Sequence, residues 1–208
     1  MWSLLPRKLQ ATAIVFATII AYLGLEWTYA WFASTPPGPF RQASFIVTII
    51  TGVLVLAANW AWPLLWRMIP ALGRTLFPDL NGVWQGKLVS TWVDPATGEV
   101  MPPIDATITI RQTLFTTHVS LKTGESTSHS TRAFLERFAE TQRFRIWYSY
   151  NNDAQAQFQH RSSPHEGVGF LECESDDLGS LTGRYYTARK TTGDIEVSRR
   201  SSSTQSKR

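Results

Sequence analysis

Hydrophobic residues follow two different patterns along this chain, and the change falls near residue 68. No charged side chain occurs in residues 9–25 or in residues 42–66, stretches of 17 and 25 residues. A bilayer core about 30 Å thick is crossed by roughly 20 apolar residues in a helix, so both stretches are predicted to be transmembrane helices. The predicted organisation is a helical hairpin at 1–68, with spans at about 9–32 and 43–66, and a linker at 69–78.

Beyond the linker, apolar and polar residues alternate, which is the pattern of strands that bury one face. Ile104, Ile108 and Ile110, for example, share one face of a predicted strand. About eight such stretches with short turns predict an antiparallel, up-and-down, lipocalin-like β-barrel at 79–200. A β-sandwich of two sheets is the alternative architecture, and the polar tail at 201–208 is predicted to be disordered. One of the predicted inner rows comprises Phe115, Thr117, Val119 and Leu121.

An up-and-down order sorts the connections between strands to the two ends of the barrel. The turns at one end are short, at 113–114, 139–142 and 176–179. The other end is predicted to gather the connections 93–103, 122–127, 151–164 and 190–193. Two of these are long, and long loops on a rigid scaffold often carry function. The asymmetry predicts a ligand mouth at the end with the long loops, facing the cytosol.

Strand ends and turns at this predicted mouth present aromatic, cationic, hydroxyl and amide side chains. Aromatic rings stack on bases, an arginine pairs with phosphate, and hydroxyls and amides bond base edges. The candidate ligand-binding residues are Trp92, Tyr148, Tyr150, Asn151, His165, Thr187, Arg189, Lys190, Thr191 and Thr192.

Several of these residues also have a purely structural interpretation. Tyr148 and Tyr185 could simply fill the barrel interior, and Arg189 could be no more than a charge at the rim. Residues 191–194 could form only a hairpin turn. Arg184 alternates to the outside of its strand and is therefore a weaker candidate than Arg189.

The formal charge of +4 is carried by the membrane part of the chain. Residues 1–78 hold five Lys or Arg and one Glu, and residues 79–208 hold 15 of each sign. A module that grips long nucleic acid needs a positive face, so polymeric nucleic acid is not an expected partner. Basic residues flank both spans, at Arg7 and Lys8 and at Arg67 and Arg74, which predicts that both termini and the barrel are cytoplasmic.

Cys173 is the only cysteine, which argues against a disulfide-stapled secreted domain. The first 25 residues could also be a signal peptide, but no small-residue cleavage site follows them. The four histidines lack metalloprotease spacing, although His160 and His165 could ligate a metal from one loop. The sequence also lacks a phosphate-binding loop and a nucleophile elbow. A non-catalytic binding protein without a metal is therefore predicted.

Four stretches carry a resemblance to a known family. They are the two-span hairpin, Asp-Leu-Asn-Gly-Val-Trp-Gln-Gly at 79–86, Ser-Pro-His-Glu-Gly-Val-Gly-Phe-Leu at 163–171, and Leu-Thr-Gly-Arg-Tyr-Tyr-Thr-Ala-Arg-Lys-Thr-Thr-Gly-Asp-Ile at 181–195. In this order they resemble the two-transmembrane β-barrel effectors of cyclic-oligonucleotide-based antiphage signalling in bacteria, which are STING-like in role. The resemblance covers nearly the whole chain except the tail.

The resemblance implies that the barrel binds a cyclic dinucleotide made by a partner cyclic-nucleotide synthase. Binding would drive self-association, and the helices would then disrupt the bacterial inner membrane; no other cofactor is implied. Two alternatives remain open, a membrane-tethered lipocalin-like carrier for an apolar molecule and a structural barrel with a filled interior. A mouth that lacks phosphate-binding cations would favour the carrier.

Overall fold

The computed structural model divides the chain into two compact units, which are described separately. One comprises residues 1–68 with 113–115, and the other comprises residues 69–112 with 116–208. The residues described by the structure are 2–32, 35–56, 64, 68, 77–94, 97–159 and 162–200.

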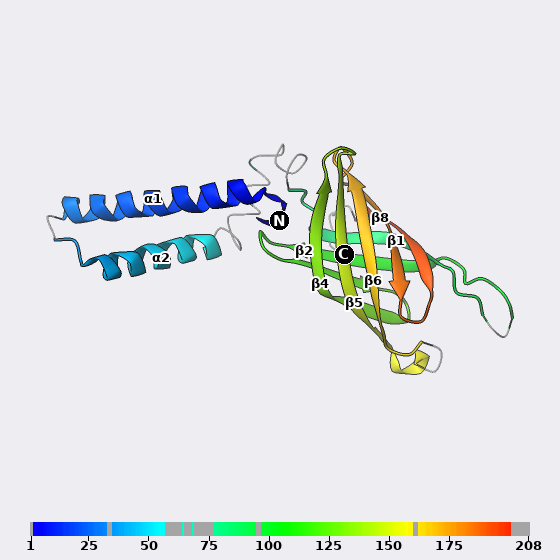
Figure 1. The fold of residues 1–208 in the computed structure, drawn as a ribbon. Coiled ribbons are helices and arrows are strands. Elements are labelled where there is room, and N and C mark those ends of the chain that lie inside the picture. The colour runs from blue at the N-terminus through cyan, green and yellow to red at the C-terminus, as the bar shows by residue number, and fades with distance from the viewer. Residues whose placement is uncertain are drawn as a thin grey trace, which may run out of the picture. The chain divides into compact units, whose positions relative to one another are not determined.

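The first unit contains two long apolar helices. A short 3-10 helix, η1 (Trp2–Leu4), precedes α1 (Arg7–Trp31), and α2 (Pro39–Leu56) follows (Figure 1). Both α-helices are long and apolar enough to cross a membrane, and neither buries a residue within the protein. The first predicted span corresponds to α1. The second begins within α2, but its residues 57–63, 65 and 66 lie outside the described residues.

The second unit is a closed antiparallel barrel in which every strand pairs with the next and the last pairs with the first (Figure 1). This confirms the predicted up-and-down barrel and rules out the two-sheet sandwich. The strands are β1 (Gly82–Ser90), β2 (Ile104–Gln112), β3 (Thr117–Lys122), β4 (Ser126–Phe138), β5 (Arg143–Ala154), β6 (His165–Glu174), β7 (Ser180–Thr187) and β8 (Thr192–Arg199). A 3-10 turn, η3 (Ala156–Phe158), lies between β5 and β6.

Alternate residues of each strand point into the barrel and form its core. Trp84, Ile108, Ile146 and Leu171 are among the fully buried side chains. The prediction that Phe115 belongs to an inner row was wrong, because its side chain is 49% exposed. Strand β3 begins only at Thr117, so residue 115 lies in the connection before it. Strand alternation therefore does not decide which way its side chain points.

The segment before β1 packs into one end of the barrel. Phe77, Pro78 and Leu80 are buried there, and Trp84 Nε1 donates a hydrogen bond to the Leu80 carbonyl (3.2 Å). Phe77 and Pro78 fall within the linker predicted at 69–78, whose earlier residues lie outside the described part of the chain. The apolar packing begins before the first strand and closes this end of the interior.

Arg199 is expected to hold the closed end together. Its guanidinium lies 4.6 Å from the centroid of the Trp84 ring and donates hydrogen bonds to the carbonyls of Asp79 and Asn81. Replacing Arg199 with alanine removes these contacts and should lower the free energy of unfolding of the barrel by about 2 kcal/mol. Urea denaturation followed by tryptophan fluorescence measures this. Arg200→Ala, at an exposed neighbour, is the control, and equal stability of the two variants would contradict the assignment.

The connections sort to the two ends as predicted. The closed end carries the short connections 113–116, 139–142 and 175–179. The opposite end carries 91–103, 123–125, 155–164 and 188–191. The loops and strand ends at this opposite end surround a cavity.

Candidate functional site

The barrel is open at the end that carries the long loops. A cavity of about 660 Å³ enters there, within the range of roughly 300–1,000 Å³ that is typical of small-molecule sites. A cavity of this size excludes the structural barrel with a filled interior. Its lining comes from Leu88, Ser90, Trp92, Asp94, Met101, Ile104, Asp105, Leu121, Thr123, Gly124, Glu125, Ser126, Ser128, Tyr148, Tyr150, Asn152, Ser162, His165, Tyr185, Thr187, Arg189 and Thr191.

Three inward tyrosines form much of the cavity wall, and each lies over a glycine of a neighbouring strand. The pairs are Tyr148 over Gly169, Tyr150 over Gly167, and Tyr185 over Gly193. A Cβ atom at Gly169 would lie 2.8 Å from Cζ of Tyr148, closer than two carbon atoms can pack. The glycines therefore let the aromatic rings lie against the wall, and this arrangement keeps the lumen open.

The tyrosine rings offer flat apolar faces with neutral hydroxyl groups. The rings of Tyr148 and Tyr150 are 5.8 Å apart between centroids. Burial raises the pKa of Tyr150 to about 12, with Tyr185 adding to the shift and Arg189 opposing it. Burial also raises the pKa of Tyr148 far above its ordinary value. Near pH 7 both phenols are protonated, so the wall adds no negative charge and can stack on a planar base.

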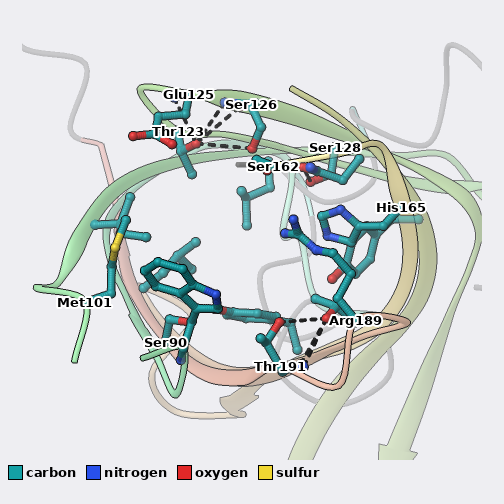
Figure 2. Close-up of a pocket in the computed structure, with 18 of the residues that line it drawn as sticks. Ser90, Met101, Thr123, Glu125, Ser126, Ser128, Ser162, His165, Arg189 and Thr191 are labelled. Carbon is teal, nitrogen blue, oxygen red and sulfur yellow. Dashed lines mark hydrogen bonds between the residues drawn. The ribbon is translucent and has the colours of Figure 1, made fainter. Parts of the chain in front are cut away.

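Arg189 supplies positive charge at the mouth. It lies in the β7–β8 turn, which the threonines at its two ends fix. The Thr187 amide donates to the Thr191 carbonyl (2.9 Å), and the two hydroxyls are 2.7 Å apart. Figure 2 shows the Arg189 side chain directed into the opening beside His165. Among the described residues, no carboxylate forms an ion pair with Arg189, so its guanidinium is available to an anion.

His165 is a neutral neighbour of this cation. Its pKa is lowered by burial and by the nearby Arg189, although its contact with the Ser163 carbonyl acts in the opposite direction. That contact joins His165 Nδ1 to the carbonyl at 3.0 Å. Because a carbonyl only accepts hydrogen bonds, Nδ1 carries the proton and Nε2 is an acceptor.

Hydrogen-bond acceptors gather on the other side of the mouth, across the opening from Arg189 (Figure 2). Thr123 Oγ1 accepts from the Ser126 amide (3.1 Å) and fixes the β3–β4 turn. Ser128 Oγ donates to Asn152 Oδ1 (3.1 Å) on β5. With the Thr123 and Ser126 hydroxyls in the same lining, this side can accept hydrogen bonds from base N–H groups and ribose hydroxyls.

The structure brings most of the predicted ligand-binding residues together. The lining contains Trp92, Tyr148, Tyr150, His165, Thr187, Arg189 and Thr191. Trp92 lies two residues beyond the end of β1 and borders the cavity.

Three predicted residues lie outside the lining. Asn151 is exposed, because the inward phase of β5 falls on Asn152. Lys190 is exposed in a left-handed turn position with φ 62°. The hydroxyl of Thr192 lies 3.2 Å from that of Thr91 on the outside of the wall. His160, considered as a metal ligand, lies outside the described residues.

Sequence reasoning missed the acceptor side of the cavity. Residues 123–126 line the cavity, and none of them is among the predicted ligand-binding residues. They form the connection that follows β3 and the first residue of β4, and this connection lies at the open end of the barrel. The predicted gathering of 122–127 at this rim was the signal that could have identified them.

Two comparisons with known proteins bear on this site. The family model described as "Cap15, cyclic dinucleotide receptor domain" matches residues 75–199. A curated protein of Staphylococcus schleiferi, "CD-NTase-associated protein 15", is 23% identical over 186 residues, which cover 89% of this chain and 90% of that protein. The second match extends well beyond the barrel, so it includes part of the helical unit.

Proposed function

This chain belongs to the Cap15 cyclic dinucleotide receptor domain family, and from that premise we propose that it is a defence effector whose barrel senses a cyclic dinucleotide. The observation that carries the proposal is Arg189, a cation without a carboxylate partner among the described residues, at the mouth of a cavity of about 660 Å³ walled by tyrosines. These groups are complementary to a phosphate and to a base. The barrel acts as a receptor rather than as a catalyst.

In the proposed complex, the two sides of the mouth bind different parts of the ligand. Arg189 pairs with a phosphate, since a guanidinium forms strong hydrogen bonds to phosphate oxygens. The faces of Tyr148 and Tyr150 stack on a base. The hydroxyls of the β3–β4 turn accept hydrogen bonds from the remaining base and ribose groups.

Ligand binding in the barrel is proposed to drive self-association of the chain in the bacterial inner membrane. The helices α1 and α2 supply the membrane part, with both termini and the barrel in the cytoplasm. A ligand that binds the associated state more tightly shifts the balance toward it. The clustered helices then disrupt the bilayer. A cyclic-nucleotide synthase provides the ligand, as the name of the Staphylococcus schleiferi relative suggests.

Dye release from vesicles tests this function. The full chain is reconstituted into dye-loaded liposomes, and cyclic dinucleotides are added one at a time. We expect one of them to cause rapid release and linear dinucleotides to cause none. Binding of a cyclic dinucleotide without release or association would refute the membrane part of the proposal and leave the receptor part standing.

Binding is expected to strengthen as the pH falls. In the unliganded chain the pKa of His165 lies below its ordinary value, and a bound phosphate raises it because an anion favours the protonated ring. The complex therefore binds more protons than the free chain. We expect affinity to increase about threefold between roughly pH 7.5 and pH 6, near the ordinary histidine pKa. In His165→Gln this dependence should disappear; an unchanged slope would show that His165 does not contact the phosphate.

A further inference from the structure

The junction between β3 and β4 is the shortest in the barrel. Only three residue pairs join these strands: Ser120 with His129, Leu121 with Ser128, and Lys122 with Thr127. Each other neighbouring pair of strands is joined by six or more. Just beyond the Ser120–His129 pair, the Val119 amide donates a hydrogen bond to the Ser130 hydroxyl (3.0 Å) instead of to a backbone carbonyl of β4.

A free strand edge follows from this short junction. Strand β4 has a bulge between Ser130 and Arg132, and from there to Phe138 it pairs with β5 alone among the described residues. On its other side, no strand among the residues that the structure describes pairs with the backbone N–H and C=O groups of 132–138. Such an edge is a template for pairing with another strand.

The side chains along this edge suit pairing with an identical edge. Leu135 is buried in the barrel, whereas Phe134 is 58% exposed on its outer face. Arg132 and Glu136 flank Phe134 at equal distances on the same outer face. If two copies pair in antiparallel fashion with Phe134 opposite Phe134, Arg132 of each copy lies opposite Glu136 of the other. The order of charges is thus self-complementary about Phe134.

The outer face beside this edge is already ordered and aromatic. Phe134 pairs across strands with Trp147, whose ring lies 5.2 Å from that of Phe170. Arg145 stacks on both of the latter rings, at 5.0 and 4.6 Å. Phe134 stands at the exposed end of this row, and pairing with a second copy would bury it against its counterpart.

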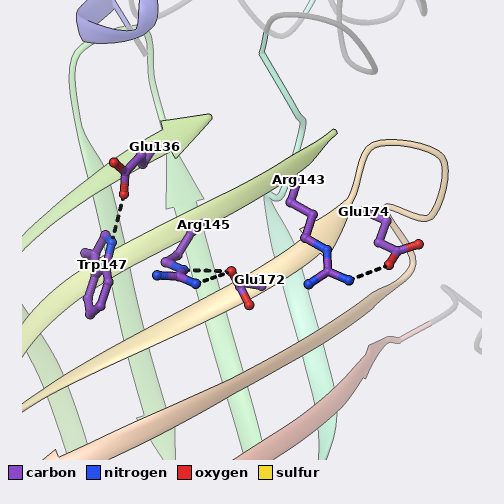
Figure 3. Close-up of polar contacts among 6 residues, drawn as sticks. All are labelled: Glu136, Arg143, Arg145, Trp147, Glu172 and Glu174. Atoms are coloured by element: carbon purple, nitrogen blue, oxygen red, sulfur yellow. Dashed lines mark hydrogen bonds and ion pairs between the residues drawn. The ribbon is translucent and has the colours of Figure 1, made fainter. Parts of the chain in front are cut away.

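Glu136 keeps one oxygen available for such a pair. Its Oε2 accepts a hydrogen bond from Trp147 Nε1 at 3.0 Å (Figure 3). This bond fixes the carboxylate on the outer face, and Oε1 remains for a cation from another chain. Figure 3 also shows that the Arg145 guanidinium is occupied by Glu172 rather than by Glu136.

We propose that a second copy of this chain docks on the β4 edge, in an antiparallel and two-fold symmetric pairing centred on Phe134. The inference rests on the proposed function in one respect: binding of the cyclic dinucleotide is what promotes this contact between copies. Ser126 and Ser128, on the first part of β4, line the cavity, so a ligand held there also orders the strand that carries the edge.

Disulfide trapping tests the pairing in the full chain. Phe134→Cys is made in a Cys173→Ala background and reconstituted into vesicles, and oxidation is followed with and without 3′,3′-linked cyclic dinucleotides. Facing Cα atoms in an antiparallel pair lie about 4.5–5.5 Å apart, within disulfide reach. We expect crosslinking about tenfold faster than for Val168→Cys, at an outer position of β6 that is 46% exposed. Equal rates for the two variants would overturn the proposal.

Charge exchange provides the second test. Arg132→Glu should weaken association about tenfold, as measured by energy transfer between labelled copies, with dinucleotide affinity unchanged. Combining it with Glu136→Arg should restore association. Wild-type association of Arg132→Glu would overturn the edge contact while the proposed function stands. If no cyclic dinucleotide binds at all, the proposed function fails, and crosslinking in densely loaded vesicles still decides the edge contact.

Discussion

Replacing Arg189 with alanine is expected to weaken cyclic dinucleotide binding about 100-fold while leaving the barrel folded. The guanidinium forms no ion pair among the described residues, so its removal leaves no carboxylate unpaired. It does remove the charge-assisted hydrogen bonds to phosphate, and each such bond contributes about 1.5–3 kcal/mol. Calorimetric titration of the full chain in detergent measures the loss.

Arg184→Ala is the matched control for this variant. Arg184 lies on β7, the strand that leads into the turn holding Arg189. Its side chain points outward and forms an ion pair with Asp194 at 2.9 Å. We expect its removal to change the affinity less than twofold. If Arg184→Ala and Arg189→Ala had equal effects, the affinity would depend on overall charge rather than on a contact inside the mouth.

Gly169→Ala should weaken binding roughly 10- to 100-fold by displacing an aromatic ring into the cavity. The added Cβ would lie 2.8 Å from Cζ and Oη of Tyr148 and 3.2 Å from the Arg184 carbonyl. Because the ring is a movable side chain and the wall is backbone, Tyr148 must leave the wall and enter the space needed by the ligand. Overpacking of this kind costs about 1–3 kcal/mol. The readout is the dinucleotide dissociation constant.

The control is Val168→Ala, at the residue that precedes Gly169 on β6. Val168 points outward and is 46% exposed, so its truncation should leave the affinity unchanged. Circular dichroism of both variants checks that the barrel is folded. A Gly169→Ala chain that binds as tightly as the wild type would show that the ligand does not use the wall at Tyr148.

Alternation along the chain was sufficient to predict the barrel. A period of two places residues such as Ile108 and Ile146 inside, and the up-and-down order then decides which loops share a rim. It also brings Trp92, His165 and Arg189 to one mouth, although they are far apart in sequence. Apolar periodicity and connection length are local properties, which is why a single sequence reveals them.

The features that were not predicted depend on which residues of a strand point inward and on the register between paired strands. Asn151 was predicted because it lies at a strand end near the mouth, yet the pleat directs Asn152 inward instead. Lys190 occupies a left-handed turn position, and its direction cannot be inferred from alternation. The ring of Tyr148 over Gly169 requires the register between β5 and β6, which neither strand specifies alone. Cross-strand register likewise determines the acceptor side of the mouth.

The most direct test of the central claim is calorimetric titration of the full chain with a panel of cyclic dinucleotides, followed by extraction of the purified protein for bound lipid. The account predicts saturable binding of at least one cyclic dinucleotide, with one ligand per barrel and loss of affinity in Arg189→Ala. The account is contradicted if no member of the panel binds and the barrel instead retains an apolar molecule that Arg189→Ala still holds.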